Sequence, residues 1–271
     1  MREGGSGRDQ AYHTLVDGMK VRFKRYGFGP TLLLLHGSGS SLDSFDEIAW
    51  HLSWRFDVVR VDLPGFGHTG ARPDRDYRIE TYVRFVDLFM IDQQIEHCVL
   101  AGHSLGGNIA WNFALSYPEQ VDRLVLMNAT GYPDKALPPS FLLARNPLGR
   151  QLMRHLSARA ATAHNLRQMV GPDFQVPESM IDRAHELMDH PGNREAFIDF
   201  ARTDQKDNSV AIPKIISPTL ILRGSGIDGQ HFGRDISDSV ETVLLGVGHL
   251  MPEEAPVEVA RAIIKFAGVR S

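Results

Sequence analysis

The sequence predicts an α/β fold in which a doubly wound, mostly parallel sheet carries an inserted helical cap. Over most of the 271 residues, short apolar runs alternate with longer segments of helical spacing, a pattern typical of strands that helices cover on both faces. Between residues 132 and 212 the strand pattern disappears, and prolines punctuate helical segments. Strands and helices alternate again after this stretch, so we interpret it as an insertion within one α/β unit.

Composition and charge exclude several classes of protein. Hydrophobic residues make up 42% of the chain and charged residues 23%, which is ordinary for a globular domain. The formal net charge is −4 without a long run of one sign, so we expect neither a nucleic acid nor a membrane as a partner. Cys98 is the only cysteine, which excludes an intrachain disulfide, and no apolar stretch is long enough to span a bilayer. We therefore expect a cytoplasmic protein.

The predicted core comprises residues 13–131 and 213–271, and the polar, glycine-rich residues 1–12 are expected to form a flexible tail. The predicted core opens with a hairpin, because segments of alternating apolar and polar residues flank the turn dipeptide Asp17-Gly18. Further strands are predicted at residues 31–35, 56–61, 98–101, 123–128, 218–222 and 241–245. Helices are predicted at residues 44–52, 77–91, 108–117 and 257–266. This order predicts a parallel sheet with right-handed crossovers.

The predicted cap, residues 132–212, contains expected helices at residues 148–163, 178–188 and 194–201. Its larger apolar side chains are expected to pack within the cap and to line a largely apolar pocket. They are Phe141, Leu142, Leu143, Met153, Leu156, Met169, Phe174 and Met188. For each of them, packing inside the cap is the alternative to contact with a ligand.

The segment GHSLG, residues 102–106, lies between a predicted buried strand and a predicted helix. Glycines on both sides of Ser104 permit a turn so tight that the serine side chain projects above the edge of the sheet. The amide of Leu105 then lies at the start of a helix, where unpaired N–H groups favour a developing negative charge. The pattern also occurs by chance in loops, but the strand before it and the helix after it favour a nucleophile elbow.

A serine nucleophile needs a neighbouring base, and the chain has 12 histidines. His249 follows the last predicted strand and therefore lies at the same edge of the sheet as Ser104. His103 is adjacent to Ser104 in the chain, but side chains of neighbouring residues diverge at a sharp turn, so it is a poor base. His36 is interpreted as a residue that organises its loop. Asp62 is interpreted in the same way, because it opens a Pro-Gly turn.

Together these motifs resemble the α/β-hydrolase superfamily. The matching segments are LLLLHG (32–37), DLPGFG (62–67), GHSLGG (102–107), PTLIL (218–222) and GH (248–249) followed by EEAP (253–256). The resemblance implies a Ser104 nucleophile, a His249 base and an oxyanion hole built from the amides of Leu105 and Ser38. It implies no metal and no organic cofactor. Serine at the elbow argues against the similar haloalkane dehalogenase and epoxide hydrolase branches, which use aspartate there.

The acid of the expected triad departs from the superfamily pattern. The family acid normally follows the strand in a Gly-x-x-Asp arrangement, whereas residues 224–227 read GSGI and the aspartate comes one position later, at Asp228. Asp228 is therefore the candidate acid, and a role at the start of a helix is the alternative. Some relatives carry the acid after the strand that precedes the cap, but that position is Asn128 here, and Asp134 lies further along.

These features predict a serine hydrolase that cleaves an ester, thioester or related acyl bond of a small, mostly apolar carbonyl substrate. The HGSG loop (36–39) is also similar to that of carbon–carbon bond hydrolases that cleave ring-fission products, although those enzymes usually continue with Pro-Gly where this chain has Ser40-Ser41. A third hypothesis is a non-catalytic small-molecule-binding protein of the same fold that lacks a competent acid. The sequence makes no prediction of oligomeric state.

Overall fold

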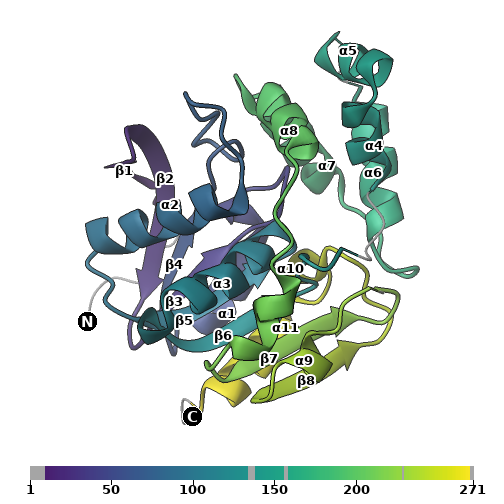
Figure 1. Cartoon of the computed structure of the whole chain (residues 1–271). Coiled ribbons are helices and arrows are strands. Elements are labelled where there is room, and N and C mark those ends of the chain that lie inside the picture. Colours follow the sequence, from purple (N-terminus) through teal and green to yellow (C-terminus); the bar gives the residue numbers. More distant parts are fainter. Residues whose placement is uncertain (1–9, 134–137, 156–157, 228, 269–271) are drawn as a thin grey trace.

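The computed structural model describes residues 10–133, 138–155, 158–227 and 229–268. Its strands are β1 (Tyr12–Val16), β2 (Met19–Gly27), β3 (Thr31–Leu35), β4 (Asp57–Val61), β5 (Cys98–His103), β6 (Val121–Met127), β7 (Thr219–Gly224) and β8 (Ser239–Leu244). These eight strands form one sheet in the order β1-β2-β4-β3-β5-β6-β7-β8 (Figure 1). β2 is antiparallel to β1 and β4, and all other neighbours are parallel. The predicted α/β fold class is confirmed.

The helices of the core cover both faces of this sheet. They are α1 (Asp46–Leu52), α2 (Ile79–Asp92), α3 (Leu105–Ser116), α9 (Phe232–Asp235), α10 (Met251–Glu254) and α11 (Pro256–Ala267), with short 3-10 helices η1 (Leu42–Phe45) and η2 (Pro118–Gln120). On β3, Leu33 and Leu35 pack with residues of α2 and α3, whereas Leu32 and Leu34 pack with residues of α1 and α11. A strand with helices on both faces buries every side chain, which explains the continuous apolar run.

The predicted N-terminal hairpin is confirmed, and its turn lies at Asp17-Gly18 as predicted. Asp17 and Gly18 connect β1 to β2 with positive φ angles of 50° and 76°. Two successive positive φ values match a turn whose twist suits two antiparallel strands, and aspartate followed by glycine tolerates them at low cost. The hairpin extends the parallel sheet by an antiparallel edge.

The described residues between β6 and β7 include the helices α4 (Pro139–Arg145), α5 (Pro147–His155), α6 (Arg159–Met169), α7 (Glu178–Asp189) and α8 (Asn193–Arg202), which we call the cap, followed by η3 (Ser209–Lys214). These helices lie together above one edge of the sheet (Figure 1). The single helix predicted over residues 148–163 is wrong, because α5 and α6 are separate helices. Ala158, immediately before α6, has extended backbone angles of φ −110° and ψ 114°. Alanine and arginine favour helix on both sides of this break, so residue preferences alone do not reveal it.

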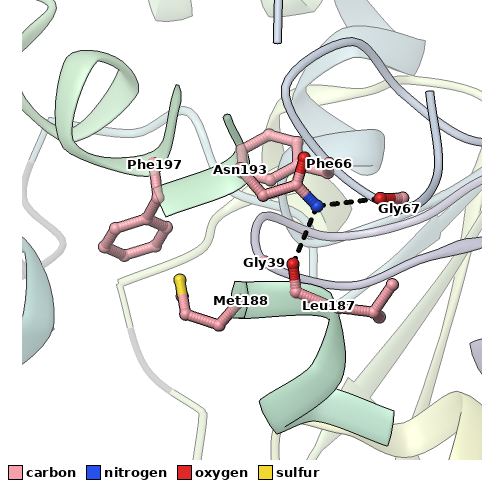
Figure 2. A pocket seen from close by; sticks show the side chains of 7 residues that line it. All are labelled: Gly39, Phe66, Gly67, Leu187, Met188, Asn193 and Phe197. Carbon is pink, nitrogen blue, oxygen red and sulfur yellow. Dashed lines mark hydrogen bonds between the residues drawn. The ribbon is translucent and has the colours of Figure 1, made fainter. Parts of the chain in front are cut away.

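Asn193 joins the cap to the core at a seam shown in Figure 2. Its side-chain Nδ2 donates hydrogen bonds of 2.8 Å to the carbonyl oxygens of Gly67 in the core and Leu187 in α7. The space that remains at this seam is about 10 Å³, which is too small for a substrate. The seam is therefore a joint rather than a binding site. Within the described part of the chain, every helix is too short or too polar to cross a lipid bilayer.

Candidate active site

Ser104 occupies a strained turn between β5 and α3. Its backbone angles are φ 53° and ψ −113°, a region that residues with a side chain seldom adopt. A Cβ atom on Gly102 would overlap the backbone of Gly106, and one on Gly106 would overlap the carbonyl oxygen of Leu35 in β3. Both glycines are therefore required by close backbone approach, and the turn has the geometry expected of a nucleophile elbow.

The structure brings His249 and Ser104 together. His249 lies in the loop after β8, and its Nε2 is 3.0 Å from the Oγ of Ser104. A histidine nitrogen at this distance is placed to take the hydroxyl proton. Ser104 is 8% exposed, so the pair lies at the bottom of a cavity rather than on the open surface.

Two side chains bind backbone carbonyl groups of residues 246–249, the segment that carries His249 and that we call the histidine loop. The Nε2–H of His103 donates a 2.7 Å hydrogen bond to the carbonyl oxygen of His249. The Nδ2 of Asn128 donates bonds of 3.0 Å to the carbonyl oxygens of both Gly248 and His249, and its Oδ1 accepts one of 2.9 Å from the N–H of Gly224. The fully buried Asn128 thus ties the ends of β6 and β7 to the loop that carries His249.

Sequence reasoning missed both of these roles. The sequence indicates only that His103 is a poor base and that residue 128 is a position where some relatives carry the acid. A carboxylate at residue 128 would have no hydrogen to donate to two carbonyl oxygens, so the amide suits the observed contacts and an acid does not. The sequence signal available was a polar residue directly after a buried strand, which does not identify its partners.

The loop at residues 36–39 lies against the elbow. A Cβ atom on Gly37 would be 3.3 Å from the Cβ of Ser104, and Ser38 lines the same cavity as Ser104, Leu105 and His249. Leu105 is the first residue of α3, so the helix itself does not use its N–H group. The four predicted residues of the nucleophile, base and oxyanion hole therefore border one space.

His36 organises this loop, as expected. Its Nε2 accepts a 2.9 Å hydrogen bond from the N–H of Leu63, so the proton resides on Nδ1, which donates 2.7 Å to the carbonyl oxygen of Gly37. Burial lowers the pKa of His36 and keeps the ring neutral. Asp62 likewise fixes backbone, because its carboxylate accepts from the N–H groups of Leu42 and His68 at 2.7 and 2.8 Å.

The cavity above Ser104 has a volume of about 850 Å³ and lies between core and cap. Of the cap side chains predicted to line a pocket, Phe141, Met153, Met169 and Met188 border it. The prediction is wrong for Leu142 and Leu143, which are exposed. Phe174 is half-buried and does not border the cavity, so packing within the cap stays the prediction for it. α4 places Phe141 and the buried Ala144 on its inner face, which leaves both leucines largely exposed, with Leu143 beside Gly149 of α5. Leu156 lies outside the described residues.

The lining of the mostly apolar cavity includes several charged side chains, among them a charged pair. The guanidinium of Arg183 in α7 contacts the carboxylate of Glu253 in α10. Burial raises the pKa of Glu253 to about 7, although Arg183 opposes this shift. The candidate acid Asp228 lies outside the described residues, as does Asp134. Among the described residues, no three histidine, cysteine or carboxylate side chains gather in a way that would bind a metal ion.

Known proteins are similar to the chain over most of its length. A family model described as the alpha/beta hydrolase fold matches residues 30–251. The chain is 27% identical to the uncharacterized hydrolase YugF of Bacillus subtilis (strain 168), over 93% of this chain and 95% of that protein. It is 23% identical to 2-hydroxy-6-oxo-6-(2'-aminophenyl)hexa-2,4-dienoic acid hydrolase of Metapseudomonas resinovorans, over 94% of this chain and 89% of that protein.

A solved structure shares the whole architecture. The crystal structure of lip1, a candidate lipase from Acinetobacter baumannii AYE, matches with a TM-score of 0.81 and 26% identity. The match covers 95% of this chain and 90% of that one. Since the family model spans most of the sequence and the sheet and elbow agree with it, the chain belongs to the alpha/beta hydrolase fold family.

Proposed function

We propose that this protein is a serine hydrolase that cleaves the ester, thioester or related acyl bond of a small, mostly apolar carbonyl substrate. The observation that carries the proposal is the 3.0 Å separation between His249 Nε2 and Ser104 Oγ at a strained strand-to-helix turn. The mostly apolar lining of the adjacent cavity supports an apolar substrate.

The reaction begins when Ser104 Oγ attacks the substrate carbonyl carbon and His249 Nε2 takes the hydroxyl proton. The carbonyl oxygen gains negative charge, which the amides of Leu105 and Ser38 stabilise. The tetrahedral intermediate then collapses to an acyl-enzyme, and His249 gives its proton to the leaving group. A water molecule, deprotonated by His249, attacks the acyl carbon, and the second collapse returns the proton to Ser104 Oγ.

The histidine needs a partner for its second nitrogen to fix the tautomer and to stabilise the imidazolium. Asp228 remains our candidate, because in the sequence it comes shortly after β7, whose carboxyl end lies at the same edge of the sheet as Ser104. Asn128 does not compete for this role, since its side chain already serves three backbone groups.

The proposal is tested by covalent labelling. A serine-directed fluorophosphonate is expected to label Ser104, as mapped by peptide mass spectrometry, and a short-chain nitrophenyl ester is expected to be hydrolysed. Ser104→Ala should abolish both labelling and hydrolysis while leaving the melting temperature close to that of the parent. Labelling of a different serine would overturn the proposal, and a parent protein without turnover would favour the non-catalytic binding protein.

A second candidate is a carbon–carbon bond hydrolase. It is favoured by the HGSG loop and by the similarity to a dienoic acid hydrolase over nearly the full chain. The kcat/KM values on a nitrophenyl ester and on a 2-hydroxy-6-oxo-dienoic acid separate the two. A preference of more than about a hundredfold for the dienoic acid, or about 2.7 kcal/mol of barrier, would replace the esterase proposal.

A further inference from the structure

The cap touches the catalytic histidine loop through its backbone. The N–H of His249 donates a 2.6 Å hydrogen bond to the carbonyl oxygen of Met169, the last residue of α6. A Cβ atom on Gly171 would overlap the carbonyl oxygen of Gly246, and one on Gly248 would overlap the backbone of Val170 and Met169. Residues 169–171 of the cap therefore lie directly against residues 246–249, with no space for a side chain between them.

Glu254 joins the same two segments. Its Oε2 accepts hydrogen bonds from the N–H of Gly248 at 2.8 Å and from the N–H of Gly171 at 2.7 Å. Its Oε1 is buried and has no hydrogen-bond partner among the residues that the structure describes. The carboxylate thus binds one peptide group of the cap and the peptide group between Val247 and Gly248, one peptide before the one that joins Gly248 to His249.

The histidine loop is consequently held both by side chains of the core and by backbone of the cap. Asn128 and His103, both in the core, bind the carbonyl oxygens of residues 248 and 249. The N–H of Gly248 donates to Glu254, whose carboxylate also accepts from Gly171 of the cap. The N–H of His249 donates to the carbonyl oxygen of the cap residue Met169. Rotation of these peptides moves the imidazole relative to Ser104, and a displacement of about 1 Å in a reacting group can lower a rate roughly a hundredfold.

We propose that Glu254 is a positioning residue that couples the seating of the cap to the alignment of His249. The carboxylate keeps the Val247–Gly248 peptide oriented only while residues 169–171 lie against the loop, so His249 Nε2 faces Ser104 Oγ when the cap is seated in this way. This inference rests on the proposed serine hydrolase function, because it assigns a support to the base of that mechanism.

Substitution of Glu254 tests the coupling. Glu254→Ala removes both acceptor contacts and is expected to lower kcat on a short-chain nitrophenyl ester about tenfold to a hundredfold, with KM within about threefold. Glu254→Gln keeps an acceptor oxygen and should recover kcat to within about fivefold of the parent. Glu258→Ala, an exposed carboxylate on α11, is the control and should leave both constants unchanged. Fluorophosphonate labelling of Ser104 should slow in parallel with kcat.

The cap side provides a second test if Glu254→Ala fails to fold. Gly171→Ala leaves the carboxylate intact but separates the two backbones, and it should lower kcat as Glu254→Ala does. Gly149→Ala introduces a comparable clash with Leu143 inside the cap, away from the histidine loop, and should leave kcat on the minimal ester within about twofold. The double variant Glu254→Ala/Gly171→Ala should lose no more than the larger single loss, because both remove one contact.

These outcomes separate the coupling from the chemistry. A parent enzyme that labels at Ser104, combined with a folded Glu254→Ala variant of unchanged kcat, would overturn the coupling and leave the serine mechanism intact. Equal losses in the Gln and Ala variants would also contradict it. Absence of labelling at Ser104 in the parent enzyme would instead overturn the proposed function itself.

Discussion

The floor of the cavity, formed by core residues around Ser104, and its roof, formed by cap residues, are built in different ways. The floor is built around Ser104, which lies in a strained turn, and His249, whose loop is held by directional hydrogen bonds such as those from Asn128. The roof consists mainly of apolar cap side chains such as Met153, and Leu148 on the outer face of the same helix is 84% exposed. Directional bonds specify a reaction geometry, whereas flexible apolar contacts tolerate variation. We therefore expect floor substitutions to change the rate for every substrate and roof substitutions to change the choice among substrates.

The largest effect is expected from Asp228, the proposed acid partner of His249. Asp228→Asn should lower kcat by about three to four orders of magnitude, because an amide favours the wrong histidine tautomer and removes the charge that stabilises the imidazolium. Asp134→Asn is the matched control and should change little. Steady-state ester hydrolysis at neutral pH measures both. A loss of less than about threefold for Asp228→Asn, roughly 0.6 kcal/mol of barrier, would remove Asp228 from the mechanism.

A smaller loss is expected at the fully buried amide beneath the histidine loop. Asn128→Asp replaces a donor by a charged acceptor that faces the carbonyl oxygens of residues 248 and 249. We expect kcat to fall about tenfold to a hundredfold and the free energy of unfolding to fall by about 2–4 kcal/mol. Asn146→Asp, at an exposed residue of the cap, keeps the acceptor that binds Leu148 and Gly149 and should be neutral. An active and stable Asn128→Asp variant would show that the floor is less specific than proposed.

The roof is probed by Met153→Ala, which enlarges the cavity without touching Ser104. Hydrolysis of longer-chain nitrophenyl esters should change about threefold to tenfold, and hydrolysis of the acetyl ester less than twofold. Leu148→Ala on the exposed face of α5 is the control and should affect neither. Phe141→Ala and Met169→Ala extend the series. If all chain lengths responded equally, the separation of roof from floor would be wrong.

The smallest effect concerns the charged pair where roof and floor meet. Burial raises the folded-state pKa of Glu253 from its ordinary value of 4.5 to about 7. Between these two values the folded state keeps a proton that the unfolded state has lost, so stability falls as pH rises through this window. Glu253→Gln removes the titrating group. Between pH 5 and pH 8 the melting temperature of the variant should therefore fall by about 2–6 °C less than that of the parent. Identical slopes in parent and variant would contradict the raised pKa.

The parts of the fold that depend on local patterns were predictable from the sequence. The leucines of β3 alternate between two covered faces, and Asp17-Gly18 adopts the positive φ angles that a tight hairpin needs. The break between α5 and α6 was not predictable, because the residues on both sides favour helix. The exposure of Leu142 and Leu143 was not predictable for a related reason, since their apolar character does not say which face of α4 is covered.

The candidate site likewise has residues that could be predicted from the sequence and residues that could not. Ser104 and His249 were found because each follows a strand at the same edge of the sheet, and the structure places them within hydrogen-bond distance. The contacts of Asn128, His103 and Glu254 were not predictable, because each depends on segments far apart in the chain whose backbones meet only in the folded molecule. Three-dimensional packing, rather than a motif, identifies these supports.

The central claim is that Ser104 carries the acyl group, and a slowly hydrolysed substrate tests it most directly. On mixing with a nitrophenyl carbamate, the enzyme should release one equivalent of nitrophenol in a burst and gain one carbamoyl group, located on Ser104 by peptide mass spectrometry. Ser104→Ala should show neither the burst nor the added mass. Steady release without a burst, or a carbamoyl group on any other residue, would contradict the account.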